Sequence, residues 1–98
     1  LVEFGNFLYN LSTLELKKGN QNVYLTESEN KLLNKLIIKK NEIVLREELA
    51  ETEFDENELR KIDVQITRLR QKIEKNPKQP NYIKTIRGKG YKLICNQI

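Results

Sequence analysis

The side chains with the clearest chemical capacity in this chain are the cations of its second half. Residues 58–98 hold 11 Lys and Arg against 3 Asp and Glu, a net charge of +8. Residues 1–57 hold 7 against 11, a net charge of −4, so the whole-chain charge of +4 hides a strong asymmetry. Clustered guanidinium and ammonium groups bind phosphate-bearing polymers. The second half is therefore predicted to bind a polyanion.

Many of these cations fall on one predicted helix. Its apolar residues are spaced 3, 4, 3 and 4 apart, which places them on one face: Leu59, Ile62, Ile66, Leu69 and Ile73. At about 100° per residue, the opposite face carries Arg60, Val64, Thr67, Arg68 and Gln71. One flank carries Lys61, Gln65 and Lys72, and the other carries Asp63 and Arg70.

These residue types suit the major groove of DNA. Arg can bind a guanine edge through two hydrogen bonds, Gln can bind adenine, and Val or the Thr methyl can contact a thymine methyl. A solvated helix face is the plain alternative. However, only Asp63 and Glu74 interrupt the cations between Arg60 and Lys75, whereas ordinary surface helices mix the two signs more evenly.

A second basic element follows the helix. The segments Tyr82–Ile86 and Tyr91–Ile94 flank Arg87-Gly88-Lys89-Gly90, and glycines at such a turn predict a β-hairpin. Charges on an edge strand can merely prevent aggregation, but the hairpin cations all have one sign: Lys84, Arg87, Lys89 and Lys92. An Arg at a hairpin tip fits the narrow minor groove, where the negative potential is focused.

The remaining composition excludes several classes of protein. The 98 residues are enough for one small domain, and 38% apolar with 33% charged residues fits a globular module. No apolar run approaches the roughly 20 residues of a membrane span. Histidine is absent and Cys95 is the only cysteine. We therefore expect no disulfide, no metal, no cofactor and no enzymatic activity.

The first half supplies the elements that position the basic ones. Short segments around Phe4–Tyr9, Leu14–Leu16 and Val23–Leu25 predict a small antiparallel sheet. Thr26 and Glu29 form a capping-box motif, which predicts a first helix from Glu27 to about Lys39. A second, shorter helix is expected from Val44 to Ala50. The stretch from Glu51 to Asn57 is expected to be an exposed acidic loop.

Four motifs in this order resemble the C-terminal DNA-binding domain of OmpR/PhoB-type response regulators. They are LTESENKLLNKL (residues 25–36), REEL (46–49), RKIDVQITRLRQKIE (60–74) and YIKTIRGKGYKL (82–93). The match extends from Phe4 to Ile94, and the last two motifs are highly specific. The resemblance implies an α+β winged helix-turn-helix: an N-terminal four-stranded antiparallel sheet, three helices and a C-terminal β-hairpin wing.

The resemblance also implies roles for individual residues. Arg68 and Val64 would read bases in the major groove, and Arg87 would enter the adjacent minor groove. Phosphate or mixed contacts are implied for Arg60, Gln65, Thr67, Arg70, Thr85 and Tyr91, and the cations Lys61, Lys72 and Lys89 complete the expected DNA-binding set. The acidic loop lies where such proteins contact RNA polymerase, through Glu51, Glu53, Asp55 and Glu56.

The wider biological setting follows from the same resemblance. It implies a cytoplasmic transcription factor that pairs with itself on direct-repeat promoter sites. A phosphorylatable receiver domain would lie upstream of Leu1, under the control of a sensor histidine kinase. Two alternatives remain: a winged-helix domain of a membrane-anchored activator, and a winged helix used only for protein docking.

Some positions depart from the family pattern. Leu45 stands where a small hydroxyl residue usually caps the second helix, Gln65 stands where His or Tyr is common, and Glu51-Thr52 lacks the usual aromatic residue. These departures concern the operator sequence and the loop conformation rather than the class of protein.

Overall fold

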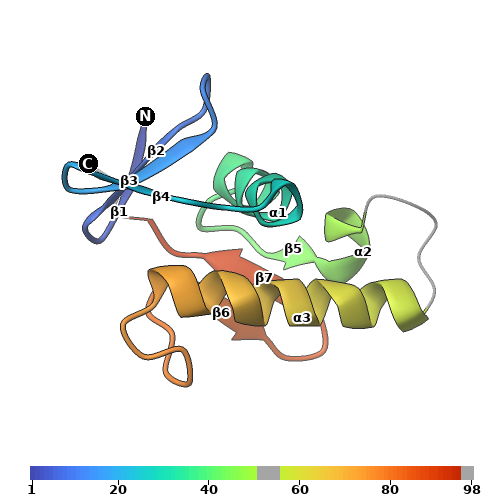
Figure 1. The fold of residues 1–98 in the computed structure, drawn as a ribbon. Coiled ribbons are helices and arrows are strands. Elements are labelled where there is room, and N and C mark those ends of the chain that lie inside the picture. Colours follow the sequence, from blue (N-terminus) through green and yellow to red (C-terminus); the bar gives the residue numbers. More distant parts are fainter. Residues whose placement is uncertain (51–55, 96–98) are drawn as a thin grey trace.

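The computed structural model describes residues 1–50 and 56–95. An N-terminal sheet comes first along the chain, followed by three helices and a second, C-terminal sheet (Figure 1). This is the predicted α+β winged helix-turn-helix order. None of the helices in the described ranges is long and apolar enough to cross a membrane.

The N-terminal sheet has four antiparallel strands in sequential order. They are β1 (Val2–Phe4), β2 (Phe7–Asn10), β3 (Glu15–Lys18) and β4 (Gln21–Val23). The single strand expected over Phe4–Tyr9 was wrong, because the chain reverses at Gly5-Asn6 and pairs Phe4 with Phe7. The strand expected over Val23–Leu25 is β4, which lies earlier in the chain and ends at Val23. The core receives Phe4, Tyr9 and Leu16 from this sheet. Buried and exposed side chains alternate along the strands, as expected for a sheet with one face in the core.

The first helix, α1 (Glu27–Ile38), begins at the predicted capping box. The hydroxyl of Thr26 accepts from the amide of Glu29 at 3.2 Å, and the Glu29 carboxylate accepts from the amide of Thr26 at 2.9 Å. The helix buries the expected apolar face: Leu32, Leu33, Leu36 and Ile37.

The second helix is shorter than the sequence suggested. Val44–Leu45 form a strand, β5, and α2 spans only Arg46–Leu49. The strand prevails because Val44 and Leu45 pair with Tyr91 and Gly90 of the C-terminal hairpin. Leu45 occupies the N-cap position, and within the described residues its side chain makes no capping bond, as the sequence departure indicated.

The third helix, α3 (Glu56–Ile73), is the longest element. The last two residues of the expected acidic loop, Glu56 and Asn57, belong to the first turn of this helix. The rest of that loop, residues 51–55, lies outside the described residues. Its predicted stripe is buried at Ile62, Ile66, Leu69 and Ile73, whereas Leu59 is only half-buried.

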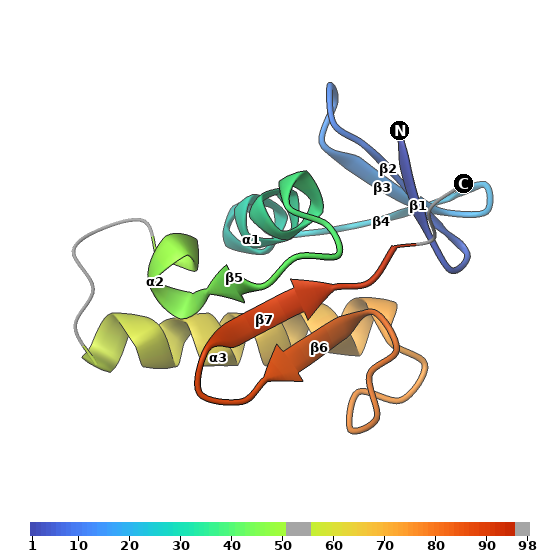
Figure 2. The ribbon, with the colours of Figure 1, turned by 180° about the vertical axis from the view of Figure 1, so that it is seen from behind.

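The C-terminal hairpin pairs β6 (Ile83–Ile86) with β7 (Gly90–Leu93), as predicted. With β5 it forms a three-stranded sheet in the order β5-β7-β6, which the sequence did not indicate. Figure 2 shows this sheet in front of α3, with the turn between β6 and β7 below the helix. The core between the two sheets and the helices includes Phe4, Leu33, Leu36, Ile66, Leu69 and Leu93.

Candidate nucleic-acid interface

The outward face of α3 carries the residues that the periodicity placed there. Val64, an apolar residue, is 50% exposed. Arg60, Thr67, Arg68 and Gln71 are exposed as well. Among the described residues, the guanidinium groups of Arg60 and Arg68 have no hydrogen-bond or ion-pair partner. The hydroxyl of Thr67 donates to the carbonyl of Asp63 at 3.0 Å, which leaves its methyl group for an apolar contact.

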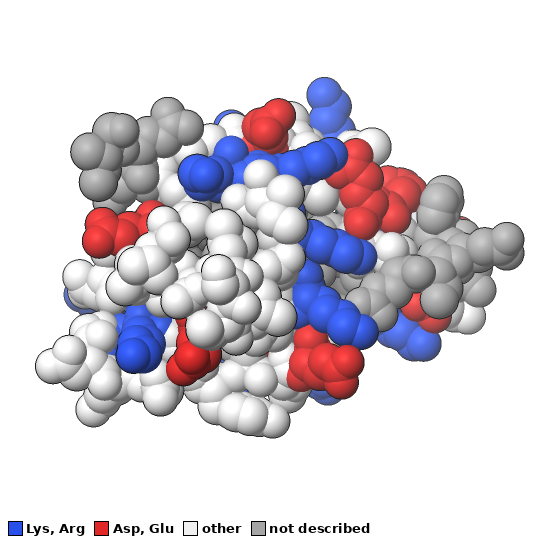
Figure 3. Space-filling model, turned by 90° about the horizontal axis from the view of Figure 1, so that it is seen from above, with Lys and Arg blue, Asp and Glu red and all other residues white. Residues whose placement is uncertain are grey.

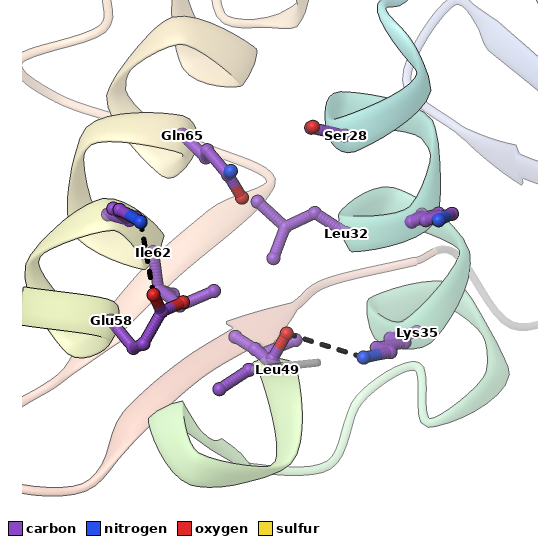
Figure 4. Close-up of a pocket in the computed structure, with 10 residues that line it drawn as sticks. Ser28, Leu32, Lys35, Leu49, Glu58, Ile62 and Gln65 are labelled. Atoms are coloured by element: carbon purple, nitrogen blue, oxygen red, sulfur yellow. Dashed lines mark hydrogen bonds and ion pairs between the residues drawn. The ribbon is translucent and has the colours of Figure 1, made fainter. Parts of the chain in front are cut away.

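The flank with Lys61 and Gln65 faces α1 instead of continuing this outward face. Gln65 points across a groove toward Ser28 and Leu32 (Figure 4). Lys61 lines the same groove, of about 220 Å³, and donates to Glu58 at 3.0 Å. Both residues were predicted to contact DNA, and the structure places them beside the outward face and turned toward α1.

Lys72, on the same flank, is bound by the start of α1. Its ammonium group lies 2.5 Å from the carboxylate of Glu29, donates to the carbonyl of Tyr24 at 3.0 Å, and lies 5.3 Å from the Tyr24 ring centroid. Burial acts to raise the pKa of Glu29, but the hydrogen bond from Lys72 and the bonds to Thr26 outweigh it, so this pKa is lowered. Lys72 thus joins α3 to α1.

The opposite flank of α3 binds the wing. The Asp63 carboxylate accepts from the Tyr91 hydroxyl at 2.6 Å and from the Arg46 guanidinium at 2.8 Å. Burial, and then the hydrogen bond to Asp63, raises the pKa of Tyr91 to about 12. Tyr91 was predicted to contact DNA; its ring lies in the core and its hydroxyl is bound within the protein.

Arg70 lies two helical turns beyond Asp63 and also faces the wing. Its guanidinium donates twice to the carbonyl of Ile83, at 3.1 and 2.7 Å, and once to the hydroxyl of Thr85 at 2.8 Å. It lies 5.6 Å from the Tyr91 ring centroid. Burial lowers the pKa of Arg70, and the neighbouring Tyr91 and Glu74 partly offset this. Two further predicted contacts, Arg70 and Thr85, are therefore bound to each other.

The wing tip is open. Arg87, Gly88 and Lys89 are exposed, and within the described chain the side chains of Arg87 and Lys89 have no partner. Gly88 has φ +75°, which a glycine adopts without strain, and nothing lies near the position of a Cβ. Gly90 differs, because a Cβ there would lie 2.1 Å from the carbonyl oxygen of Val44. The side chains of Arg87 and Lys89 at the tip are thus available to a ligand, while the base at Gly90 is tightly packed on β5.

Charges are more evenly mixed elsewhere on the surface. Viewed from the side of α1 and the N-terminal sheet, cations and acids alternate around a broad uncharged area (Figure 3). Ion pairs on α1 and α2 include Lys31 with Glu27 and Lys39 with Glu48. The outward face of α3 and the wing tip differ from these pairs, because Arg60, Arg68, Arg87 and Lys89 have no partner among the described residues.

Three positioning residues were missed by the sequence interpretation. Asp63 and Arg46 link α3 to the wing and α2. The buried Glu74 carboxylate accepts from the amides of Asn81, Tyr82 and Ile83 at 2.8 to 3.2 Å, which holds the chain entering β6. For Asp63 and Glu74 the available signal was an acid inside an otherwise basic segment, since such an acid often has a structural partner; Arg46 offered no such signal.

The chain is similar to known proteins in sequence and in fold. Residues 20–93 match the family model described as "Transcriptional regulatory protein, C terminal". The protein PetR of Rhodobacter capsulatus is 38% identical over 100 residues, covering 94% of this chain and 42% of PetR.

Two solved structures are similar over nearly the whole chain. The response regulator DrrB of Thermotoga maritima, described as an OmpR/PhoB homologue, has a TM-score of 0.83 and 32% identity, covering 94% of this chain and 43% of DrrB. The RstA DNA-binding domain of Klebsiella pneumoniae, solved with the RstA box, has a TM-score of 0.83 and 29% identity, covering 95% of both chains. The chain thus spans less than half of PetR and DrrB.

Proposed function

The chain belongs to the family defined by the C-terminal domain of transcriptional regulatory proteins, and from this premise we propose how its surface reads DNA. The domain is a winged helix-turn-helix that regulates transcription by binding DNA, and its role is binding rather than catalysis. In the proposal, α3 enters the major groove and the wing tip reaches the adjacent minor groove.

One observation carries this assignment. Four exposed cations without a partner among the described residues lie on the outward face of α3 and on the wing tip: Arg60, Arg68, Arg87 and Lys89. A duplex offers two adjacent grooves separated by a phosphate backbone, and a helix beside a projecting hairpin matches that spacing. Positive side chains without internal partners lose no intramolecular bond when they bind phosphates or bases.

The outward residues take different roles in the proposal. Arg68 and Val64 contact base edges, Arg60 and Thr67 contact the backbone beside them, and Arg87 enters the minor groove. Lys89 adds a phosphate contact at the tip. Lys72, Arg70 and Tyr91 act first by holding α3 to α1 and to the wing, and Lys61 and Gln65 lie at the edge of the contact surface.

The proposal extends to the partners of the longer protein. We propose that two copies bind direct repeats spaced by about one helical turn, 10–11 base pairs. We further propose a cytoplasmic response regulator, with a receiver domain controlled by a sensor histidine kinase and an RNA polymerase contact near Glu56. PetR and DrrB, which are longer than this chain and similar to it, support this setting.

A salt titration of DNA binding tests the proposal. Five exposed cations lie on α3 and the wing: Arg60, Arg68, Lys84, Arg87 and Lys89. If each neutralises the charge of one phosphate, from the backbone or from within a groove, the slope of log K against log salt is about −4 to −5, at roughly −0.9 per phosphate. Arg68→Ala should weaken binding to a selected site by about 1–3 kcal/mol and relax its base preference. Lys17→Ala, which removes an exposed charge from β3, is the matched control and should change little. Binding that ignores salt would instead favour a winged helix used for protein docking.

A further inference from the structure

The two residues that attach α3 to the wing are seven positions apart on one flank of the helix. Asp63 binds β7 through the Tyr91 hydroxyl, and Arg70 binds β6 through the carbonyl of Ile83 and the hydroxyl of Thr85. Each strand of the hairpin is therefore held at a separate point along α3. Two attachments prevent a rotation that one attachment would allow.

Asp63 also connects this joint to the helix-turn-helix. One carboxylate oxygen accepts from Tyr91 and the other from Arg46, the first residue of α2. Asp63 directly precedes Val64 on the outward face. A single side chain thus links α2, the proposed DNA-reading helix and the wing.

Along the hairpin, Tyr91 lies only two residues from the wing tip. Tyr91 pairs with Thr85 and the neighbouring Gly90 pairs with Ile86, so only residues 87–89 extend beyond the paired strands. A change of angle at Tyr91 is therefore carried to Arg87 through one antiparallel pair.

We propose that Asp63 and the Tyr91 hydroxyl are positioning groups that set the wing against α3, so that Arg87 reaches the minor groove while Arg68 and Val64 read the major groove. This inference rests on the proposed function. It gives the Tyr91 hydroxyl a role through Arg87, in place of a direct contact with a DNA phosphate.

Tyr91→Phe isolates this role. The substitution removes the hydroxyl and keeps the buried ring and its contact with Arg70. Tyr24→Phe is the matched control, because Tyr24 is 78% exposed and lies away from the wing. Binding is measured by fluorescence anisotropy for the parent, both single variants, Arg87→Ala and the double variant Tyr91→Phe/Arg87→Ala. Two duplexes are used that differ only in A·T or G·C flanks beside the site.

The expected result is a loss that depends on both the flank and Arg87. Tyr91→Phe should lower the affinity for the A·T-flanked duplex by about three- to tenfold, the range expected for one lost hydrogen bond. It should change the affinity for the G·C-flanked duplex much less. In the Arg87→Ala background it should have no further effect on either duplex. Tyr24→Phe should match the parent throughout.

Other results overturn the inference. An equal loss on both duplexes, with or without Arg87, would mean that the hydroxyl contacts a phosphate directly. No loss on either duplex would mean that the hydrogen bond does not position the wing. Circular dichroism must show each variant folded at the assay temperature, and Asp63→Asn, whose amide oxygen can still accept from Tyr91, should retain part of the flank preference. If the parent itself does not bind DNA, the proposed function fails first.

Discussion

Arg68 and Arg70 lie two positions apart on one helix and differ completely in their surroundings. Arg68 faces outward and, within the described residues, has no partner for its guanidinium group. Arg70 donates three hydrogen bonds to the wing and lies 5.6 Å from the centroid of the Tyr91 ring. The same division separates the wing tip at Arg87 from its packed base at Gly90. The cations of α3 therefore fall into two groups: those available to bind a ligand and those that stabilise the fold.

This division has a physical origin. When a guanidinium group leaves a buried carbonyl, the carbonyl loses its hydrogen-bond donor. A buried acceptor without a donor costs about 1–3 kcal/mol. A solvated guanidinium exchanges water for a phosphate or base without such a loss. The following variants should separate the two regions by their effects on folding and on binding.

The largest contrast is expected between the two glycines of the wing. Gly90→Val should cost more than about 4 kcal/mol of unfolding free energy, because the added side chain meets the backbone of Val44 where β5 pairs with β7. Gly88→Ala should cost only about 1–2 kcal/mol, through its positive φ. Urea denaturation followed by circular dichroism measures both. Similar costs at the two positions would contradict the distinction between a packed base and an open tip.

Breaking the ion pair between Lys72 and Glu29 should have the next largest effect. Lys72→Met keeps the aliphatic stem but leaves the buried Glu29 carboxylate without its cation, at a cost of about 3 kcal/mol. The lowered pKa of Glu29 also predicts a pH dependence. Its contribution to stability is present above the ordinary value of 4.5 and is lost as the pH falls through the lower pKa of the folded state.

The measurement is the unfolding free energy of parent and variant between neutral and acidic pH. The parent should lose stability more steeply below pH 4.5 than Lys72→Met does. Lys75→Met is the matched control, since Lys75 is exposed just beyond the end of α3. If Lys72→Met keeps the stability of the parent but weakens DNA binding strongly, Lys72 belongs with the outward cations.

Arg70→Ala and Arg68→Ala should have opposite profiles. Arg70→Ala should lower the unfolding free energy by about 2 kcal/mol, because the Ile83 carbonyl loses its bonds to the guanidinium. Arg68→Ala should leave stability within about 0.5 kcal/mol and act on DNA binding. Each variant is measured by urea denaturation and by a DNA-binding titration. If Arg68→Ala lowers stability and Arg70→Ala acts only on DNA binding, the roles given to the two arginines are wrong.

The sequence indicated the order of elements and the outward face of α3, because both depend on local patterns. The apolar spacing from Leu59 to Ile73 defines the face, and Thr26 with Glu29 defines the start of α1. It could not show that β5 pairs with β7, nor that Lys72, Arg70 and Tyr91 are bound within the protein. Those features depend on partners 13 to 48 positions away along the chain, which no local pattern encodes.

The smallest effect on stability is expected at the wing tip, where the effect on DNA binding should depend on the sequence beside the site. Arg87→Ala should leave the unfolding free energy within about 0.5 kcal/mol, since the side chain is exposed. It should lower the affinity for a site with A·T-rich flanks more than for one with G·C-rich flanks, because the narrow minor groove of A·T tracts concentrates negative potential. Lys89→Ala removes a neighbouring charge and should affect both flanks equally if Lys89 contacts only phosphate. Competition titrations of the two variants against both duplexes distinguish groove insertion from charge alone. If the two substitutions behave identically, the tip supplies only positive charge, and sequence reading is confined to the outward face of α3.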